Sequence, residues 1–374
     1  MLEDFRGARR LCPGRKNIRL TACGFFMRIL VDKIASATRN VRVGRDLRVA
    51  PAITAREGYL VAGRIHGTKS VYNQIEDVHG RMVTLHDGDV IVGVLGHRNA
   101  LHGYSGYVPE AINVGDRLHL LNLGGVIGVC TSQNPEVGKP FDVEILGAVL
   151  TFPDFEDRSG VPAHIGMNAI ALREEPRTDV PVAFVAGTCM NSGKTAAASR
   201  LIRYLSREGM TVGGCKLTGV SLRRDTLSMM DYGAKWAVSF TDAGVVTTSP
   251  ETSKRVARGL VRHLADAGAQ VIVAELGDGI LGEYGVQGIL GDTELMKAAG
   301  AIVMCANDPV GAWGAQRVMT ERFGLGIDVV TGPATDNAVG TGFVERELKL
   351  TAINARTHPE EFGAFVAGRL SRGL

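Results

Sequence analysis

The sequence predicts an α/β protein in which a parallel sheet with helices on both faces follows a smaller, mainly-β domain, either a barrel or a sandwich. Three observations lead to this prediction. The chain has 374 residues, and one hydrophobic core seldom grows past about 250–300 residues. Short strand-like runs fill the first half of the chain. From Pro181 onward, apolar runs instead alternate with helical stretches, a rhythm typical of parallel sheets covered by helices.

The mainly-β domain is expected over residues 27–175. Its β-branched or alternating runs are bounded by turn signals such as Asp87-Gly88 and Gly115-Asp116. These runs are 59–63, 81–85, 89–95, 117–123, 126–130 and 141–150. The polar, proline-bearing segment 173–181 is predicted to be a linker. Residues 1–26 are rich in arginine and are interpreted as a basic arm, either disordered or upstream of a true start at Met27.

The α/β domain is expected over residues 181–374. Its predicted strands are 182–186, 211–215, 270–275, 301–305 and 327–330, and its predicted helices are 196–206, 253–267, 292–299 and 312–323. Ligands of parallel sheets bind beyond the carboxyl ends of the strands. The polar residues that follow these strands are therefore the candidates for a site.

The most specific motif lies between the first of these strands and the first of these helices. Its residues are Gly187, Thr188, Cys189, Met190, Asn191, Ser192, Gly193, Lys194 and Thr195. A glycine-rich turn that leads into a helix exposes backbone N–H groups to phosphate oxygens. In such a P-loop the lysine holds the β- and γ-phosphates and the Thr195 hydroxyl binds Mg²⁺. We therefore predict a P-loop domain that binds a nucleoside triphosphate.

The loop has one residue more than the usual spacing, since five residues separate Gly187 from the Gly193-Lys194 pair. A loop that begins Gly-Thr and ends Gly-Lys-Thr resembles that of dethiobiotin synthetase. The resemblance covers only the carboxy-terminal half, and it continues in Cys215-Lys216-Leu-Thr-Gly219 and in Val271-Ile-Val-Ala-Glu275. Molybdopterin-guanine dinucleotide biosynthesis GTPases show a related pattern of a lysine after a strand.

The resemblance implies further site residues. Lys216 would act with Lys194 as a catalytic residue that contacts the transferring phosphate, and an ammonium there could neutralise developing charge. The metal ligands would be Thr195, Asp225 and Glu275, because a carboxylate that ends an apolar strand is costly unless it meets a cation. Asp278 is an alternative ligand and Asp231 competes with Asp225, while Glu283 is interpreted as an exposed loop acid.

The residue that reads the base is left open by the sequence. Asn337 occupies a place that resembles the adenine-reading asparagine of the synthetase, which favours ATP, although GTP is not excluded. Asn307-Asp308 follows an earlier strand, and either asparagine can instead form a turn. The segment 96–109 carries His97 and His102 and is interpreted as a polar binding loop at a barrel rim, because two histidines at this spacing fix no metal geometry.

Composition excludes several classes of protein. A net charge of +3 is too small to indicate nucleic-acid binding, and no stretch approaches the length of a membrane span. Six cysteines in a chain of this size do not form a disulfide framework, so we expect a cytoplasmic protein. The resembling families also imply a homodimer.

Two functions follow from these observations. The first is an ATP- and Mg²⁺-dependent enzyme that activates or carboxylates a small carboxylate- or amine-bearing molecule through phosphoryl transfer. The alternative is a nucleotide-driven switch or accessory NTPase that acts on a protein partner in cofactor or metal delivery.

Overall fold

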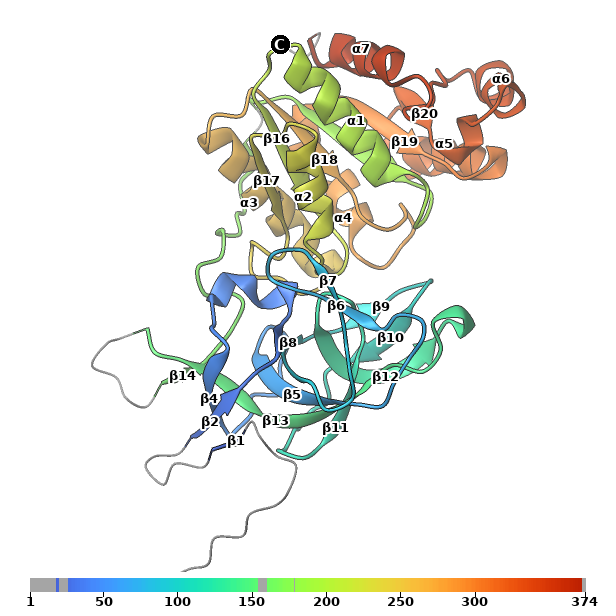
Figure 1. Ribbon diagram of the computed structural model, residues 1–374. Helices are drawn as coiled ribbons and strands as arrows, with labels where there is room; N and C mark the ends of the chain where they lie inside the picture. Colours follow the sequence, from blue (N-terminus) through green and yellow to red (C-terminus); the bar gives the residue numbers. More distant parts are fainter. Residues whose placement is uncertain (1–17, 20–25, 154–159, 178, 372–374) are drawn as a thin grey trace, which may run out of the picture.

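The computed structural model describes residues 18–19, 26–153, 160–177 and 179–371, arranged as a mainly-β half and an α/β half that lie against each other (Figure 1). The loops at the top of the β half meet the lower edge of the α/β half. The basic arm predicted for residues 1–26 lies almost entirely outside the described residues. No helix in the described part of the chain is both long enough and apolar enough to cross a membrane.

The β half is built from strands and two short 3₁₀ helices. Its elements are β1 (Ile18–Arg19), β2 (Met27–Leu30), β3 (Lys33–Ile34), η1 (Ser36–Val41), β4 (Asp46–Ala50), β5 (Leu60–His66), β6 (Gln74–Glu76), β7 (Met82–Thr84), β8 (Val90–Leu95), β9 (Arg98–Asn99), β10 (Tyr104–Tyr107), β11 (Arg117–Leu120), β12 (Val126–Gln133), η2 (Pro135–Val137), β13 (Asp142–Thr151) and β14 (Val161–Pro162).

Five of these strands pair in a closed ring, because β13 pairs with β5, β5 with β8, β8 with β12, β12 with β11 and β11 again with β13. Every residue of β8 is buried, since both faces of that strand pack against apolar side chains. The long strand β13 has a register shift between Ile145 and Gly147. Gly147 has φ 149°, and a Cβ there would lie 2.7 Å from the Ala50 carbonyl oxygen, so the bulge requires glycine.

The α/β half contains one six-stranded sheet and its covering helices. Its elements are β15 (Val182–Gly187), α1 (Lys194–Arg207), β16 (Val212–Lys216), α2 (Arg224–Asp231), β17 (Trp236–Ser239), α3 (Pro250–Asp266), β18 (Val271–Glu275), α4 (Val286–Leu290), η3 (Leu295–Ala298), β19 (Ala299–Cys305), α5 (Pro309–Phe323), β20 (Val329–Thr331), η4 (Pro333–Thr335), α6 (Ala338–Glu347) and α7 (Pro359–Leu370).

The strand order is β17-β16-β18-β15-β19-β20, and every pair is parallel. One apolar cluster joins one face of the sheet to α3, α4, α5 and α6, through residues such as Leu260, Ala312 and Val344. A second cluster joins the opposite face to α1, α2 and α7, through residues such as Leu201 and Phe362. The prediction of a parallel sheet with helices on both faces is therefore confirmed.

Some elements differ from the sequence-based expectation. The helix predicted over 292–299 is only the 3₁₀ turn η3, followed at once by β19. Asp292 precedes this turn, forms a buried ion pair with Arg258 and accepts a bond from the Leu295 N–H. The edge strand β17 was not predicted, because its apolar run, Trp236-Ala237-Val238, is only three residues long.

Candidate nucleotide-binding site

The phosphate-binding loop connects the buried strand β15 to the amino terminus of α1, as the motif predicts. Gly193 caps the helix with φ 95°, and Asn191 also has a positive φ of 60°. A Cβ on Gly187 would lie 2.3 Å from the Ser192 Oγ. The loop therefore closes tightly on the end of the strand, and this close approach requires glycine at position 187.

The Lys194 ammonium is held inside the loop. Its Nζ donates to the Cys189 carbonyl at 2.6 Å and to the Ser192 Oγ at 3.4 Å. The residue is only 6% exposed, and this burial lowers the pKa of Lys194 from its ordinary value. A buried ammonium with only neutral hydrogen-bond acceptors is well suited to meet an anion.

Glu275 lies at the carboxyl end of β18, next to the start of α1. The Thr195 hydroxyl donates to its Oε1 at 2.9 Å. Its other oxygen, Oε2, is buried and has no hydrogen-bond partner among the described residues. Burial raises the pKa of Glu275, because the charged carboxylate is disfavoured in a site that excludes water.

Lys216 and Asp225 form a buried ion pair that joins the end of β16 to the first turn of α2. Burial disfavours the charged lysine, but the carboxylates of Asp225 and Glu275 outweigh it and raise the pKa of Lys216. The pKa of Asp225 is lowered, because its attraction to Lys216 exceeds the opposing effect of burial. Asp231, the competing candidate, is exposed at the far end of α2.

These groups line one pocket of about 370 Å³ at the carboxyl ends of β15, β16 and β18. Of the predicted site residues, the pocket brings together Met190, Asn191, Gly193, Lys194, Thr195, Lys216, Asp225 and Glu275. Gly187, Thr188, Cys189 and Ser192 shape the loop from behind this lining. Asp278 also lines the pocket, its Oδ1 is a buried acceptor without a partner among the described residues, and burial raises its pKa. Glu283 is exposed, as expected of a loop acid.

A smaller cavity of about 180 Å³ adjoins the loop at Gly193 and Ala196, which line both cavities. Its far wall carries Asp336, Asn354 and Arg356. The Asp336 Oδ1 accepts bonds from the Asn354 Nδ2 at 2.9 Å and from an Arg356 guanidinium nitrogen at 3.1 Å.

Asn337 does not line this cavity. Its Oδ1 accepts from the Val339 and Gly340 N–H groups at 3.0 and 3.2 Å and caps α6. The observed contacts are those of the alternative interpretation, a loop asparagine that forms a turn. The adjacent Asp336 was missed, although an acid after the last apolar strand was a signal in the sequence.

Glu76 of the β half binds the segment that leads into α2. This residue is 0% exposed, and its carboxylate accepts from the Arg223 N–H at 2.6 Å, the Arg224 N–H at 2.8 Å and the Ser36 hydroxyl. Asp225 follows directly in the chain and reaches the pocket. The two halves are thus joined at the two residues that directly precede a pocket carboxylate, a contact that no local sequence pattern indicated.

The loop 96–109 also contacts the α/β half. The Thr247 hydroxyl donates to the His97 carbonyl at 2.6 Å, and the Asn99 N–H approaches the Tyr284 hydroxyl at 3.2 Å. A cavity of about 750 Å³ lies here, and Glu57 and His97 line it. Within the described residues, no group of three or more His, Cys, Asp or Glu side chains is arranged to hold a metal ion.

Comparison with known proteins gives only distant similarities to solved structures. No family model and no curated protein matches the chain. Among solved structures, the signal recognition particle receptor FtsY from Elizabethkingia anophelis is 12% identical, with 55% of this chain and 69% of that chain aligned and a TM-score of 0.36. Cell division protein FtsY from Thermotoga maritima is 14% identical over 54% of this chain and 71% of that chain, also with a TM-score of 0.36.

The hydrogenase maturation factor HypB from Archaeoglobus fulgidus is 16% identical, with 51% of this chain and 90% of that chain aligned and a TM-score of 0.33. The resemblance to dethiobiotin synthetase stays a prediction. The loop, the parallel sheet and the position of the pocket define the carboxy-terminal half as a P-loop nucleotide-binding domain.

Proposed function

We propose that the protein is a Mg²⁺-dependent nucleoside triphosphatase whose nucleotide state is coupled to its β half. The observation that carries this proposal is the convergence of Lys194, the Thr195–Glu275 pair and the Lys216–Asp225 pair in one pocket at the P-loop. Two ammonium groups would hold and neutralise the transferring phosphoryl group. Three carboxylates, those of Asp225, Glu275 and Asp278, and the Arg224 guanidinium line the same pocket.

Thr195 and Glu275 fit a magnesium ion. Mg²⁺ prefers oxygen ligands and is held in proteins by one or two of them together with phosphate oxygens and water. The buried Oε2 of Glu275 lacks a partner among the described residues, so a cation would offset the cost of its burial. A bound Mg²⁺ would supply charge neutralisation at the β- and γ-phosphates. Asp225 lines the same pocket and would complete the acidic wall.

The cavity beside Gly193 is the candidate base site, and its chemistry favours guanine. An ionised carboxylate only accepts hydrogen bonds. Guanine offers two donors, N1–H and the 2-amino group, side by side, whereas the corresponding edge of adenine presents an acceptor at N1. Asp336 on the cavity wall therefore favours GTP over the ATP expected from the sequence, and Asp336→Asn should reduce that preference.

Coupling between the halves would follow from Glu76. Its carboxylate holds the backbone that leads into α2, and α2 carries Asp225, which pairs with Lys216 in the pocket. A change in the charge of the bound nucleotide would act on that pair and thus on the contact with the β half. This supports the nucleotide-driven switch.

A second function has an observation of its own. The cavity that Glu57 and His97 line is bounded on the α/β side by residues 281–284, and the same loop carries Asp278 into the phosphate pocket. A small acceptor molecule bound there would lie next to the loop that borders the phosphates. This supports the phosphoryl-transfer enzyme of the ligase type, with Glu57 as a candidate base.

The test is hydrolysis of GTP and ATP by the purified protein, with Mg²⁺ and with EDTA, together with binding of a fluorescent nucleotide. We expect Mg²⁺-dependent phosphate release with a preference for GTP, and a loss of at least 100-fold in Lys194→Ala. The matched control is Lys297→Ala, because Lys297 forms only an exposed ion pair on η3. Thr195→Val should weaken nucleotide binding only when Mg²⁺ is present.

Adding small carboxylic acids and amines to the same assay separates the two functions. Phosphate release that rises with one of them and yields a new adduct by mass spectrometry would establish the enzyme of the ligase type. Slow release that no small molecule stimulates would favour the switch. If neither GTP nor ATP binds measurably, both proposed functions are wrong.

A further inference from the structure

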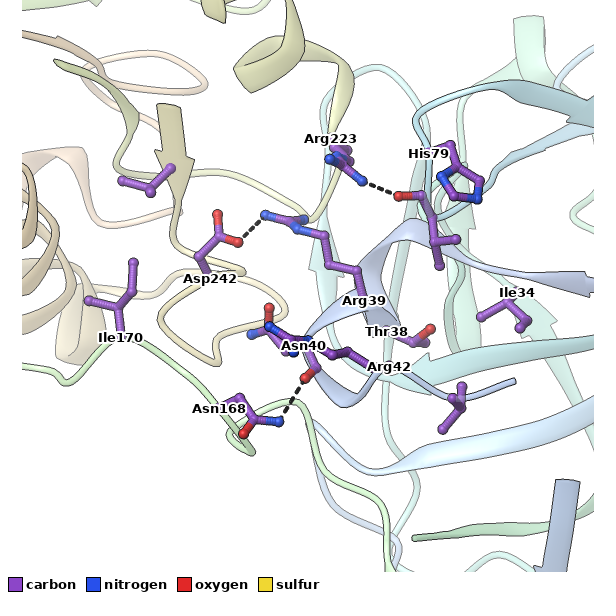
Figure 2. A pocket seen from close by; sticks show the side chains of 13 residues that line it. Ile34, Thr38, Arg39, Asn40, Arg42, His79, Asn168, Ile170, Arg223 and Asp242 are labelled. Atoms are coloured by element: carbon purple, nitrogen blue, oxygen red, sulfur yellow. Dashed lines mark hydrogen bonds and ion pairs between the residues drawn. The ribbon is translucent and has the colours of Figure 1, made fainter. Parts of the chain in front are cut away.

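A second cavity, of about 490 Å³, lies where the two halves meet and away from the phosphate pocket (Figure 2). None of its lining residues lines the phosphate pocket or the base cavity. The β half contributes Arg39 and Arg42, and the α/β half contributes Arg223 and Asp242. Its volume is that of a small-molecule site.

The lining carries excess positive charge. It contains three arginines and one carboxylate, that of Asp242. Arg39 pairs with Asp242 at 2.5 Å, and Asp242 also accepts from the Ser239 N–H at 2.7 Å. The only acid of the lining is therefore fully engaged. No acidic side chain in the described part of the chain lies within ion-pair distance of Arg42 or Arg223.

The arginines have unused donors. The Nη1 of Arg39 is buried and has no hydrogen-bond partner among the described residues. Arg223 donates one Nη1 bond to the Val78 carbonyl oxygen, so most of its guanidinium remains available. Each guanidinium has five N–H donors in a fork that matches the oxygens of carboxylates and phosphates.

The backbone around the cavity is held in an uncommon conformation. Arg42 and Asn168 both have positive φ, 57° and 61°, which costs a residue other than glycine about 1 kcal/mol or more. Asn168 donates to the Asn40 carbonyl at 3.1 Å, and Asn40 donates to the Thr241 carbonyl at 2.7 Å. These bonds join both halves around the cavity. Strained residues of this kind gather at ligand sites more often than elsewhere.

We propose that this cavity binds a small organic anion through Arg42 and Arg223, with Arg39 as the third cationic group. The anionic head would carry phosphate or several carboxylates, since both match the arginine fork. The half-buried side chains of Ile34, Val43, Ile170 and Val238 offer an apolar wall for the rest of the molecule. The site goes beyond the proposed nucleotide hydrolysis, because it needs no nucleotide.

The experiment is titration calorimetry of the full chain with pyrophosphate and with citrate, at constant ionic strength and without nucleotide. The test variant is Arg42→Gln, because Arg42 is exposed and its loss should not affect folding. Arg45→Gln is the matched control, since Arg45 is an exposed arginine of the same segment outside the cavity. Lys194→Ala removes the lysine of the phosphate loop and therefore reports on binding there.

We expect at least one of the two anions to bind with a submillimolar Kd. In the Lys194→Ala background, in which the phosphate loop lacks its lysine, its affinity should fall at least fivefold when Arg42→Gln is added and stay unchanged when Arg45→Gln is added. The anion that binds more tightly identifies the head group. Binding that is lost in Lys194→Ala but kept in Arg42→Gln would place the anion in the phosphate loop and overturn the proposal. Absence of binding by both anions would overturn it as well.

Discussion

The buried ion pair between Lys216 and Asp225 allows the contributions to folding and to hydrolysis to be separated. The perturbation is Lys216→Met, which keeps the length of the side chain and removes its charge. The side chains of Lys216 and Asp225 are only 14% and 11% exposed, so the variant would leave a buried carboxylate without its main partner. The remaining cation is the exposed guanidinium of Arg224, whose Nε lies 4.0 Å from the Asp225 Oδ1. We expect loss of stability and loss of activity from this single change.

The magnitude follows from the burial of the pair. Removing one partner of a buried ion pair costs about 3–5 kcal/mol. Because both side chains retain some solvent contact, the lower end applies, about 3 kcal/mol. A change of 1 kcal/mol moves the unfolding midpoint of a domain of this size by about 2–4 °C. The midpoint should therefore fall by roughly 6–12 °C, and kcat for triphosphate hydrolysis should fall by about 100-fold or more.

The double variant Lys216→Met/Asp225→Asn separates the two effects. It removes the orphaned charge, so at least half of the lost stability should return. Hydrolysis should not return, because the ammonium is still missing. The assays are thermal unfolding and phosphate release with Mg²⁺, and Lys297→Met, an exposed lysine, is the control.

Two results would refute this reasoning. A single variant as stable as the parent protein would mean that solvent reaches the Asp225 carboxylate and the pair is not buried in solution. A double variant that hydrolyses nucleotide at the parent rate would show that Lys216 has no part in phosphoryl transfer.

Three further predictions follow from single side chains. Glu76→Gln replaces the carboxylate that accepts from two backbone N–H groups, so it should lower the free energy of unfolding by about 2 kcal/mol and weaken nucleotide binding. Unchanged nucleotide binding would contradict the proposed coupling between the halves. Burial raises the pKa of Glu57 to about 7, so the folded state keeps a proton that the unfolded chain releases, and stability should fall as pH rises from about 4.5 to 7. With solvent screening of the partly exposed side chain, the free energy of unfolding should fall by about 1 kcal/mol. Glu57→Gln should flatten this dependence of stability on pH, whereas Glu110→Gln, at an exposed residue, should not. An unaltered slope in both variants would contradict the raised pKa of Glu57. Gly187→Ala would place a Cβ 2.3 Å from the Ser192 Oγ, so nucleotide affinity should fall at least tenfold; parent affinity would show that the loop can shift.

Much of the α/β half could be predicted from the sequence because its signals are local. Fully buried strands such as β15 and β18 form continuous apolar runs, and the turn from Gly187 to Lys194 has few conformations open to it. Parallel pairing then brings the carboxyl ends of these strands to one edge. The resemblance to dethiobiotin synthetase placed Lys216 and Glu275 in one site, and the structure has these residues, 59 positions apart in sequence, opposite each other in the β16–β18 register.

The features that only the tertiary structure decided depend on contacts between distant segments. Asp225 and Asp231 lie on the same short helix, and only the packing of α2 brings the first to Lys216. Asn337 was one candidate for contact with the base; its side chain caps α6, and the neighbouring Asp336 lines the cavity beside the phosphate loop. The contact between Glu76 and the start of α2 forms only because the β half lies against the carboxyl-end edge of the sheet. The arginine-lined cavity forms for the same reason, since both halves contribute to its lining. A charge pattern along the chain cannot specify such a contact, since burial and partner are set only when the two halves meet.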